Sequence, residues 1–92
     1  MAEQAVLNEQ EHRFEIPTRG GMAVLAFQRG PTLLNLVHTE VPPADEGAGY
    51  GSTLVRTAME YARSHHLKVV PSCPFVQRWL KRHREFDDLI VR

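Results

Sequence analysis

The sequence of 92 residues is poor in several features that would direct it to particular classes of protein. Its single cysteine excludes an internal disulfide framework and is typical of a reducing compartment. Eleven acidic residues balance eleven basic ones, so no net charge draws the chain toward nucleic acid or an acidic membrane. Its apolar runs are far shorter than a membrane span, and residues 1–12 have no apolar core of a signal peptide. We expect a cytoplasmic protein without nucleic-acid or membrane partners.

Metal ligands are scarce as well. His65 and His66 are adjacent near the expected end of a helix, where the negative end of the helix dipole favours partial protonation. A metal site usually needs three or four converging ligands, so we expect no metal. A basic run near the end of the chain has few interleaved aromatics, and we interpret it as a solvated helix face that leaves contact with a ligand phosphate open. The run consists of Arg78, Lys81, Arg82 and Arg84.

The composition is that of a small globular protein. Hydrophobic residues make up 42% of the chain, too many for a disordered segment. A length of 92 residues suits one domain with a single core, so we predict one domain over residues 1–92, with residues 1–10 as a polar lead-in.

Turn residues divide the first half of the domain into three strands. Turn signals at residues 17–21 and 29–32 separate strands predicted over residues 12–16, 22–28 and 33–41. Such short turns imply an antiparallel meander. In the third strand, strict alternation places four side chains on one face. They are Leu34, Leu36, His38 and Glu40.

The second half alternates helix and strand. Apolar residues at helical spacing predict a helix from the glycine-rich stretch at residues 46–53 to about residue 66, with one stripe packed on the sheet. A short strand over residues 67–71 should then lie parallel to the third strand through a right-handed crossover. A second helix begins at Pro74, and the tail over residues 85–92 should cover the core. The predicted class is therefore α+β, a three-stranded antiparallel meander followed by a β-α-β crossover and a C-terminal helix.

The glycine-rich stretch is the strongest candidate for a ligand site. Three glycines at alternate positions, Gly47, Gly49 and Gly51, form a loop without side chains where a helix begins. The first N–H groups of that helix have no intrahelical partner and suit a phosphate. The stretch lacks the lysine of a Walker loop and the spacing of a dinucleotide fingerprint. A plain chain reversal fits the loop equally well.

Two other residues could carry chemistry. Cys73 precedes Pro74 and would be the N-cap of the second helix, where the dipole favours a thiolate, although a lone cysteine is also often a buried apolar residue. His38 lies shortly before the glycine loop and could act as a general base near a ligand held there, or as a core histidine.

These motifs together resemble a known family, the short, single-domain GNAT-like N-acetyltransferases of the YjdJ type. The resemblance covers about residues 12–90. It rests mainly on the segment from His38 to Pro42, on Gly47 to Val55, and on Lys68 to Val76 followed by Arg82 and His83.

The resemblance implies that the glycine loop binds the pyrophosphate of acetyl-CoA and that the third strand pairs with the pantetheine arm. The implied cofactor-binding residues are Thr39, Glu40, Val41, Gly47, Ala48, Gly49, Tyr50, Gly51, Ser52 and Thr53. Two departures from the superfamily pattern stand out. Glu46 replaces a Gln or Arg and is expected to point away from the pyrophosphate, and the last helix lacks the tyrosine that many members use as an acid. Cys73 and His38 are the catalytic candidates.

The implied function is transfer of an acetyl group from acetyl-CoA to an unidentified amine acceptor. The alternatives are an acyl-CoA-binding module with little or no transferase activity and a protein-interaction domain. The chain has no counterpart of the N-terminal helices that usually wall the acceptor site. An acceptor pocket would therefore be open, completed by a second copy in a homodimer, or supplied by a partner.

Overall fold

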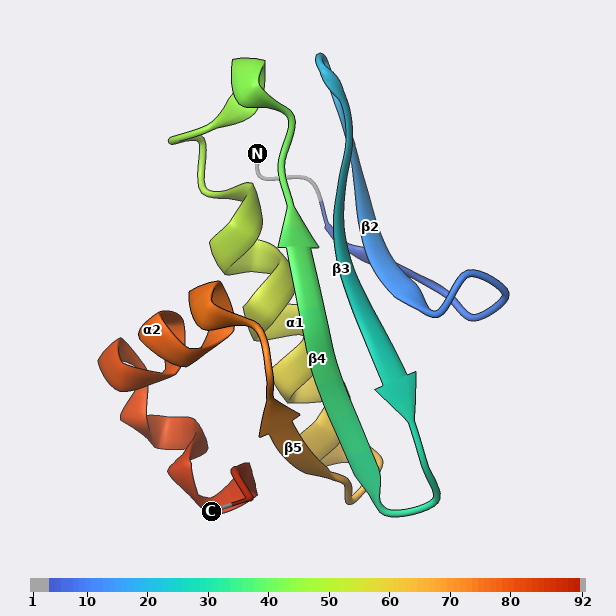
Figure 1. Ribbon diagram of the computed structural model, residues 1–92, viewed down its shortest axis with the longest axis vertical. Coiled ribbons are helices and arrows are strands. Elements are labelled where there is room, and N and C mark those ends of the chain that lie inside the picture. Colours follow the sequence, from blue (N-terminus) through green and yellow to red (C-terminus); the bar gives the residue numbers. More distant parts are fainter. Residues whose placement is uncertain (1–3, 92) are drawn as a thin grey trace.

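The computed structural model describes residues 4–91 as one sheet with helices packed on it (Figure 1). The sheet has the strand order β1-β2-β3-β4-β5. Its strands are β1 (Val6–Asn8), β2 (Arg13–Thr18), β3 (Gly21–Arg29), β4 (Leu33–Glu40) and β5 (Lys68–Pro71). The α-helices are α1 (Tyr50–Ser64) and α2 (Pro74–Arg82), and the 3-10 helices are η1 (Pro43–Asp45) and η2 (Arg84–Leu89). Among these described residues, no helix is long and apolar enough to cross a membrane.

The core lies between α1 and one face of the sheet. The predicted apolar stripe of α1 is confirmed, because all five of its side chains are fully buried; they are Leu54, Val55, Ala58, Met59 and Ala62. α1 crosses behind the sheet in Figure 1, while α2 lies beside β5. Within residues 4–91, no helix lies in front of β3 and β4, whose outward side chains such as Val24, Ala26 and Asn35 are only half-buried.

The predicted α+β architecture is confirmed, and the meander has one strand more than predicted. β1 lies within residues 1–10, which the sequence suggested were a polar lead-in, and pairs antiparallel with β2. Leu7 lies opposite Phe14 in that register and packs against the core. A strand of three residues is too short for hydrophobic alternation to reveal it.

The crossover and the tail also follow the prediction. β5 pairs parallel to β4, from Leu33 opposite Lys68 to Leu36 opposite Pro71. In the tail, Phe86 and Leu89 are buried. The chain then returns to the free edge of β5, where the Val91 N–H donates to the Val69 carbonyl at 2.9 Å.

A β-bulge in β4 changes which side chains face the core. In the register with β3, Phe27 lies opposite Leu36 and Ala26 opposite His38, so Val37 is an extra residue. Leu34 and Leu36 face α1 before the bulge, and Thr39, opposite the buried Leu25, takes that face after it. The prediction that His38 and Glu40 share a face with Leu34 and Leu36 is therefore wrong. The bulge turns His38 outward, and its side chain is 63% exposed.

Candidate functional site

A cavity opens where β4 and β5 separate. The last backbone hydrogen bond between the two segments runs from the Cys73 N–H to the Leu36 carbonyl at 3.0 Å. Beyond it, β4 continues to Glu40, while the segment after β5 turns into α2. The cavity above this point has a volume of about 500 Å³. Its lining residues are Thr39, Val41, Asp45, Glu46, Gly47, Gly49, Tyr50, Gly51, Ser52 and Phe75.

The start of α1 presents backbone donors to this cavity. Gly49 is the N-cap residue, and no side chain caps the helix. The first intrahelical bond is from the Thr53 N–H to the Gly49 carbonyl, at 3.1 Å. The N–H groups of Tyr50, Gly51 and Ser52 therefore have no acceptor within the helix. They carry the positive end of the helix dipole, which favours an anion.

The three glycines of the loop have two different roles. Gly47 and Gly49 adopt φ angles of 86° and 88°, and a Cβ at either position would enter open space with no atom within 4 Å. Both glycines line the cavity, so a side chain at either position would project from its wall into open space. Gly51 is needed for packing instead, because its Cβ would lie 2.8 Å from the Phe75 ring. Glycine at this position lets α2 approach α1 closely.

The side-chain charge at the cavity is negative. Asp45 and Glu46 line it, and none of the basic residues that the structure describes does. Glu46, which the sequence predicts to point away from a pyrophosphate, is one of the lining residues. Asp45 is held in place because one of its carboxylate oxygens accepts a hydrogen bond from the Gly20 N–H at 3.1 Å. A phosphate in this cavity would depend on backbone donors for its binding.

Cys73 lies below the floor of the cavity, at the N-cap of α2 as the sequence predicts. It is buried, and its Sγ lies 3.4 Å from the Thr39 Oγ1 across the gap between the strands. Burial raises the pKa of the thiol, but hydrogen bonds from the Thr39 side chain and from the backbone of Val76 and Phe75 together outweigh it. The net pKa of Cys73 is below its ordinary value, and Thr39 connects the thiol to the cavity.

Thr39→Val is expected to raise the pKa of the Cys73 thiol. Valine keeps the shape of threonine but removes the hydroxyl that stabilises the thiolate, so the thiolate fraction at neutral pH should fall. An ultraviolet titration of thiolate absorbance against pH measures the change. Thr53→Val, which removes a hydroxyl bonded only to the Gly49 carbonyl, is the control. An unchanged titration in Thr39→Val would assign the stabilisation to the backbone N–H groups alone.

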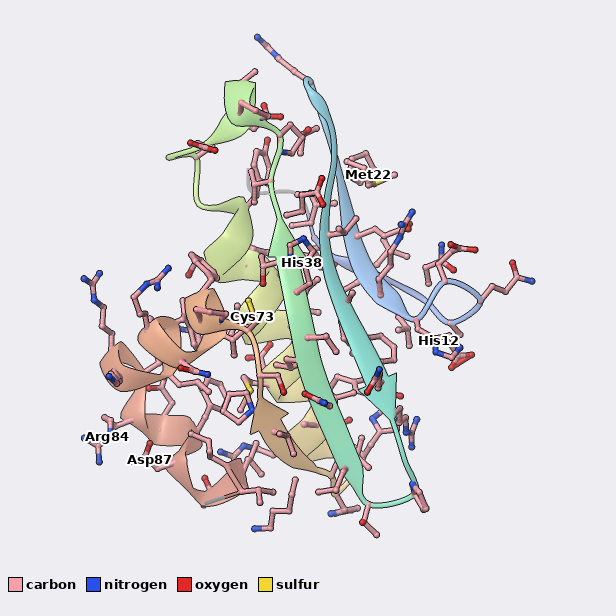
Figure 2. The ribbon with its side chains drawn as sticks, in the orientation of Figure 1. His12, Met22, His38, Cys73, Arg84 and Asp87 are labelled. Atoms are coloured by element: carbon pink, nitrogen blue, oxygen red, sulfur yellow. The ribbon has the colours of Figure 1, made fainter. Side chains whose placement is uncertain are left out.

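His38 lies on the other side of the sheet from α1. Its Nε2 is 3.3 Å from a Glu40 carboxylate oxygen, and neither residue lines the cavity. Figure 2 shows His38 on β4 and Cys73 at the start of α2. The bulge thus separates the two catalytic candidates onto opposite faces of β4. The described residues include no group of three His, Cys, Asp or Glu side chains arranged to hold a metal ion.

Most of the predicted cofactor-binding residues line the cavity together. Glu40, Ala48 and Thr53 are the exceptions. Asp45, Glu46 and Phe75 also line the cavity but were not among the predicted cofactor-binding residues. The only sequence signal for Phe75 is Gly51, the small residue against which its ring packs.

Comparisons with known proteins identify the family. A family model described as GCN5-related N-acetyl-transferase matches residues 13–89. Protein NATD1 from Mus musculus is 29% identical over 79 residues, which cover 83% of this chain and 72% of that protein. Protein NATD1 from Xenopus tropicalis is 34% identical over 62 residues, which cover 66% of this chain and 57% of that protein. The chain thus spans less than two thirds of the length of the Xenopus relative.

A solved structure shows the same fold. The solution structure of a GCN5-like protein from Staphylococcus aureus superposes with a TM-score of 0.71 at 24% sequence identity. The match covers 99% of this chain and 91% of that one. The family match over residues 13–89 and the shared fold lead to one conclusion: this chain belongs to the GCN5-related N-acetyltransferase family.

Proposed function

We propose that this protein binds acetyl-CoA in the cavity at the start of α1 and transfers the acetyl group to an amine acceptor. The observation that carries the proposal is the uncapped start of α1 beside Gly47 and Gly49, which line the cavity and have open space at their Cβ positions. Family membership supports the pyrophosphate of acetyl-CoA as the anion. A pyrophosphate in this space would accept hydrogen bonds from the N–H groups of Tyr50, Gly51 and Ser52.

The remaining lining residues suit the rest of that ligand. Val41, Tyr50 and Phe75 provide apolar and aromatic surface. The half of β4 beyond Leu36 has no strand paired on its β5 side, so the backbone of residues 39–41 can bond an extended arm. Bound acetyl-CoA supplies an acetyl thioester, whose carbonyl carbon an amine can attack.

Two groups of this chain are placed to move protons. The Glu40 carboxylate can only accept a hydrogen bond, so in the neutral His38 ring Nε2 donates to it and Nδ1 is the free acceptor. We propose that His38 Nδ1 accepts the proton of the acceptor amine, which approaches from the open face of the sheet. Cys73 Sγ, on the inner side of β4, is assigned the proton that the departing thiolate takes up. The two proton transfers would then occur from opposite sides of the strand.

Removing either proton-transfer group, by Cys73→Ala or His38→Ala, is expected to lower kcat roughly a hundredfold while leaving acetyl-CoA affinity nearly unchanged, because general acid–base groups contribute about that much. Thiol release from acetyl-CoA with a panel of amines measures kcat, and calorimetry measures affinity. Cys73→Ser tests whether a hydroxyl can replace the thiol. Unchanged turnover in Cys73→Ala would remove the thiol from the mechanism.

Two alternatives give different results in the same experiments. An acyl-CoA-binding module would bind acetyl-CoA but release no thiol with any amine. The missing tyrosine on α2 favours this alternative over acetyl transfer. The negative charge of Asp45 and Glu46 at the cavity opposes an anionic cofactor and favours a third alternative, a protein-interaction domain. An interaction domain would show no binding at millimolar acetyl-CoA, a result that would exclude both cofactor-dependent functions.

A further inference from the structure

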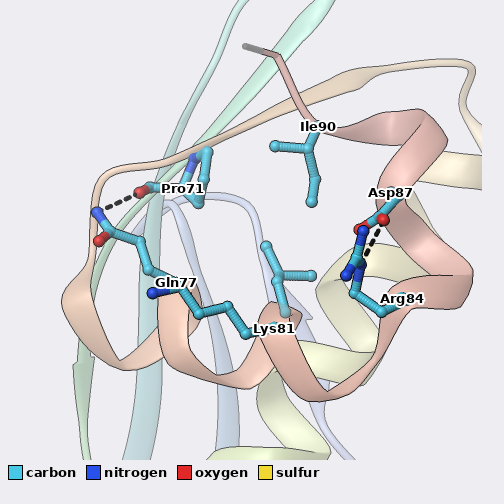
Figure 3. Close-up of a pocket in the computed structure, with 7 residues that line it drawn as sticks. Pro71, Gln77, Lys81, Arg84, Asp87 and Ile90 are labelled. Atoms are coloured by element: carbon cyan, nitrogen blue, oxygen red, sulfur yellow. Dashed lines mark hydrogen bonds and ion pairs between the residues drawn. The ribbon is translucent and has the colours of Figure 1, made fainter.

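A second cavity lies on the far side of α2 from the acetyl-CoA site. It has a volume of about 340 Å³, within the range of small-molecule sites, and shares no lining residue with the first cavity. It lies between α2, the end of β5 and η2 (Figure 3). Its lining residues are Pro71, Gln77, Leu80, Lys81, Arg84, Asp87 and Ile90.

The cavity has an apolar floor. Leu80 is buried, and Ile90 packs against the core with part of its surface open to the cavity. Pro71 is the third apolar residue of the cavity, and its carbonyl accepts a hydrogen bond of 2.9 Å from the Gln77 side chain. Figure 3 shows this bond closing one end of the cavity. The Gln77 amide thus fixes a wall, and the apolar floor can hold a short apolar group.

The rim carries an excess of positive charge. The Arg84 Nε donates to an Asp87 carboxylate oxygen at 2.5 Å, so these two charges offset each other and hold the guanidinium at the cavity (Figure 3). Lys81 has no hydrogen-bond or ion-pair partner within residues 4–91. Its ammonium group and the terminal N–H groups of Arg84 remain available as donors to an anion.

We propose that this cavity binds a small organic acid, with the carboxylate on Lys81 and Arg84 and a short apolar group on Pro71, Leu80 and Ile90. The apolar floor favours a carboxylate that carries a hydrocarbon group over inorganic phosphate, which would leave that floor uncovered. The site also gives a function to part of the basic run, which acetyl transfer does not use. It does not depend on acetyl-CoA binding, because the two cavities are separate.

N-acetyl-L-leucine tests the proposal, with N-acetyl-L-leucinamide as its uncharged counterpart. Amide signals of residues 77–84 and of Ile90 in the full-length, ¹⁵N-labelled protein should shift and saturate with the acid at millimolar concentration. N-acetyl-L-leucinamide should bind roughly tenfold more weakly than the acid, because it has no carboxylate to form charge-assisted hydrogen bonds. Shifts that never saturate, or that centre on the residues of the first cavity, would refute the site. Equal affinity for acid and amide would refute the role of the cations.

Matched variants separate a local site from the general charge of α2. Lys81→Met keeps most of the apolar stem and should weaken the acid roughly tenfold. Arg78→Met removes a cation from the same helix outside the cavity and should leave the affinity unchanged. Equal weakening by the two variants would show only a diffuse attraction to the helix and would overturn the proposal.

Discussion

Gly49→Val is expected to weaken acetyl-CoA binding roughly a hundredfold. Its side chain would enter the open space in front of the uncapped N–H groups of α1 and keep a pyrophosphate away from them. Loss of two charge-assisted hydrogen bonds, at about 1.5 kcal/mol each, corresponds to a change of that size in the dissociation constant. Isothermal calorimetry with acetyl-CoA measures it.

A control must separate this effect from backbone strain. Gly49 has a φ of 88°, a conformation that costs valine about 1–3 kcal/mol of stability. Gly21 also has a positive φ, of 142°, and lies outside the cavity, so Gly21→Val should lower the melting temperature without changing acetyl-CoA affinity. If Gly49→Val melts early but binds acetyl-CoA as well as the unmodified protein does, the loop does not hold the pyrophosphate.

Trp79→Ala should cause the largest loss of stability, about 3–5 kcal/mol. Trp79 is buried between α1 and η2, stacks on His83 with ring centroids 3.6 Å apart, and lies under the Arg56 guanidinium. The loss is a large share of the 5–15 kcal/mol typical of a folded domain. In thermal unfolding, the midpoint should fall by more than about 12 °C for a domain of this size.

A milder substitution isolates one contact of Trp79. Its Nε1–H donates to the Ser52 Oγ at 2.7 Å, which joins α2 to the first turn of α1 beside the cavity. Trp79→Phe keeps an aromatic ring, loses this bond and should cost about 1 kcal/mol for the bond itself. A double-mutant cycle with Ser52→Ala measures the coupling. If Trp79→Phe lowers the free energy of unfolding as much as Trp79→Ala does, the size of the indole ring, rather than burial of any aromatic ring, determines the stability.

The sequence was sufficient to predict β2 to β5, α1 and α2, and to place the candidate site at the start of α1, but it did not reveal β1. The turns predicted around Gly20 and Gly30 are present, although Pro17 itself pairs with Met22 within the β2–β3 ladder. The helical spacing of Leu54 to Ala62 identifies the buried stripe of α1. These signals are local, since each depends on residues within one turn or one element. The same is true of Cys73, whose N-cap position follows from Pro74.

The missed features depend on contacts between distant residues. Phe75 lines the cavity because Gly51, 24 positions earlier, admits its ring, and no periodicity within α2 reveals that contact. Glu46 lies at the cavity because the neighbouring Asp45 bonds the turn at Gly20. Val37 gives no sign of a bulge, since a valine fits an ordinary strand equally well.

The bulge at Val37 adds one residue to β4 and thereby shifts the inward–outward alternation of the residues that follow it. Each residue after the bulge lies on the side of the sheet opposite to that expected from unbroken alternation. The inner face of β4 therefore contacts the core before the bulge and lines the cavity after it. Any comparison of relatives that aligns β4 by alternation alone will exchange the partners of Thr39 and His38. An alignment of β4 must therefore establish whether a relative has the extra residue at Val37 before residues beyond it are compared.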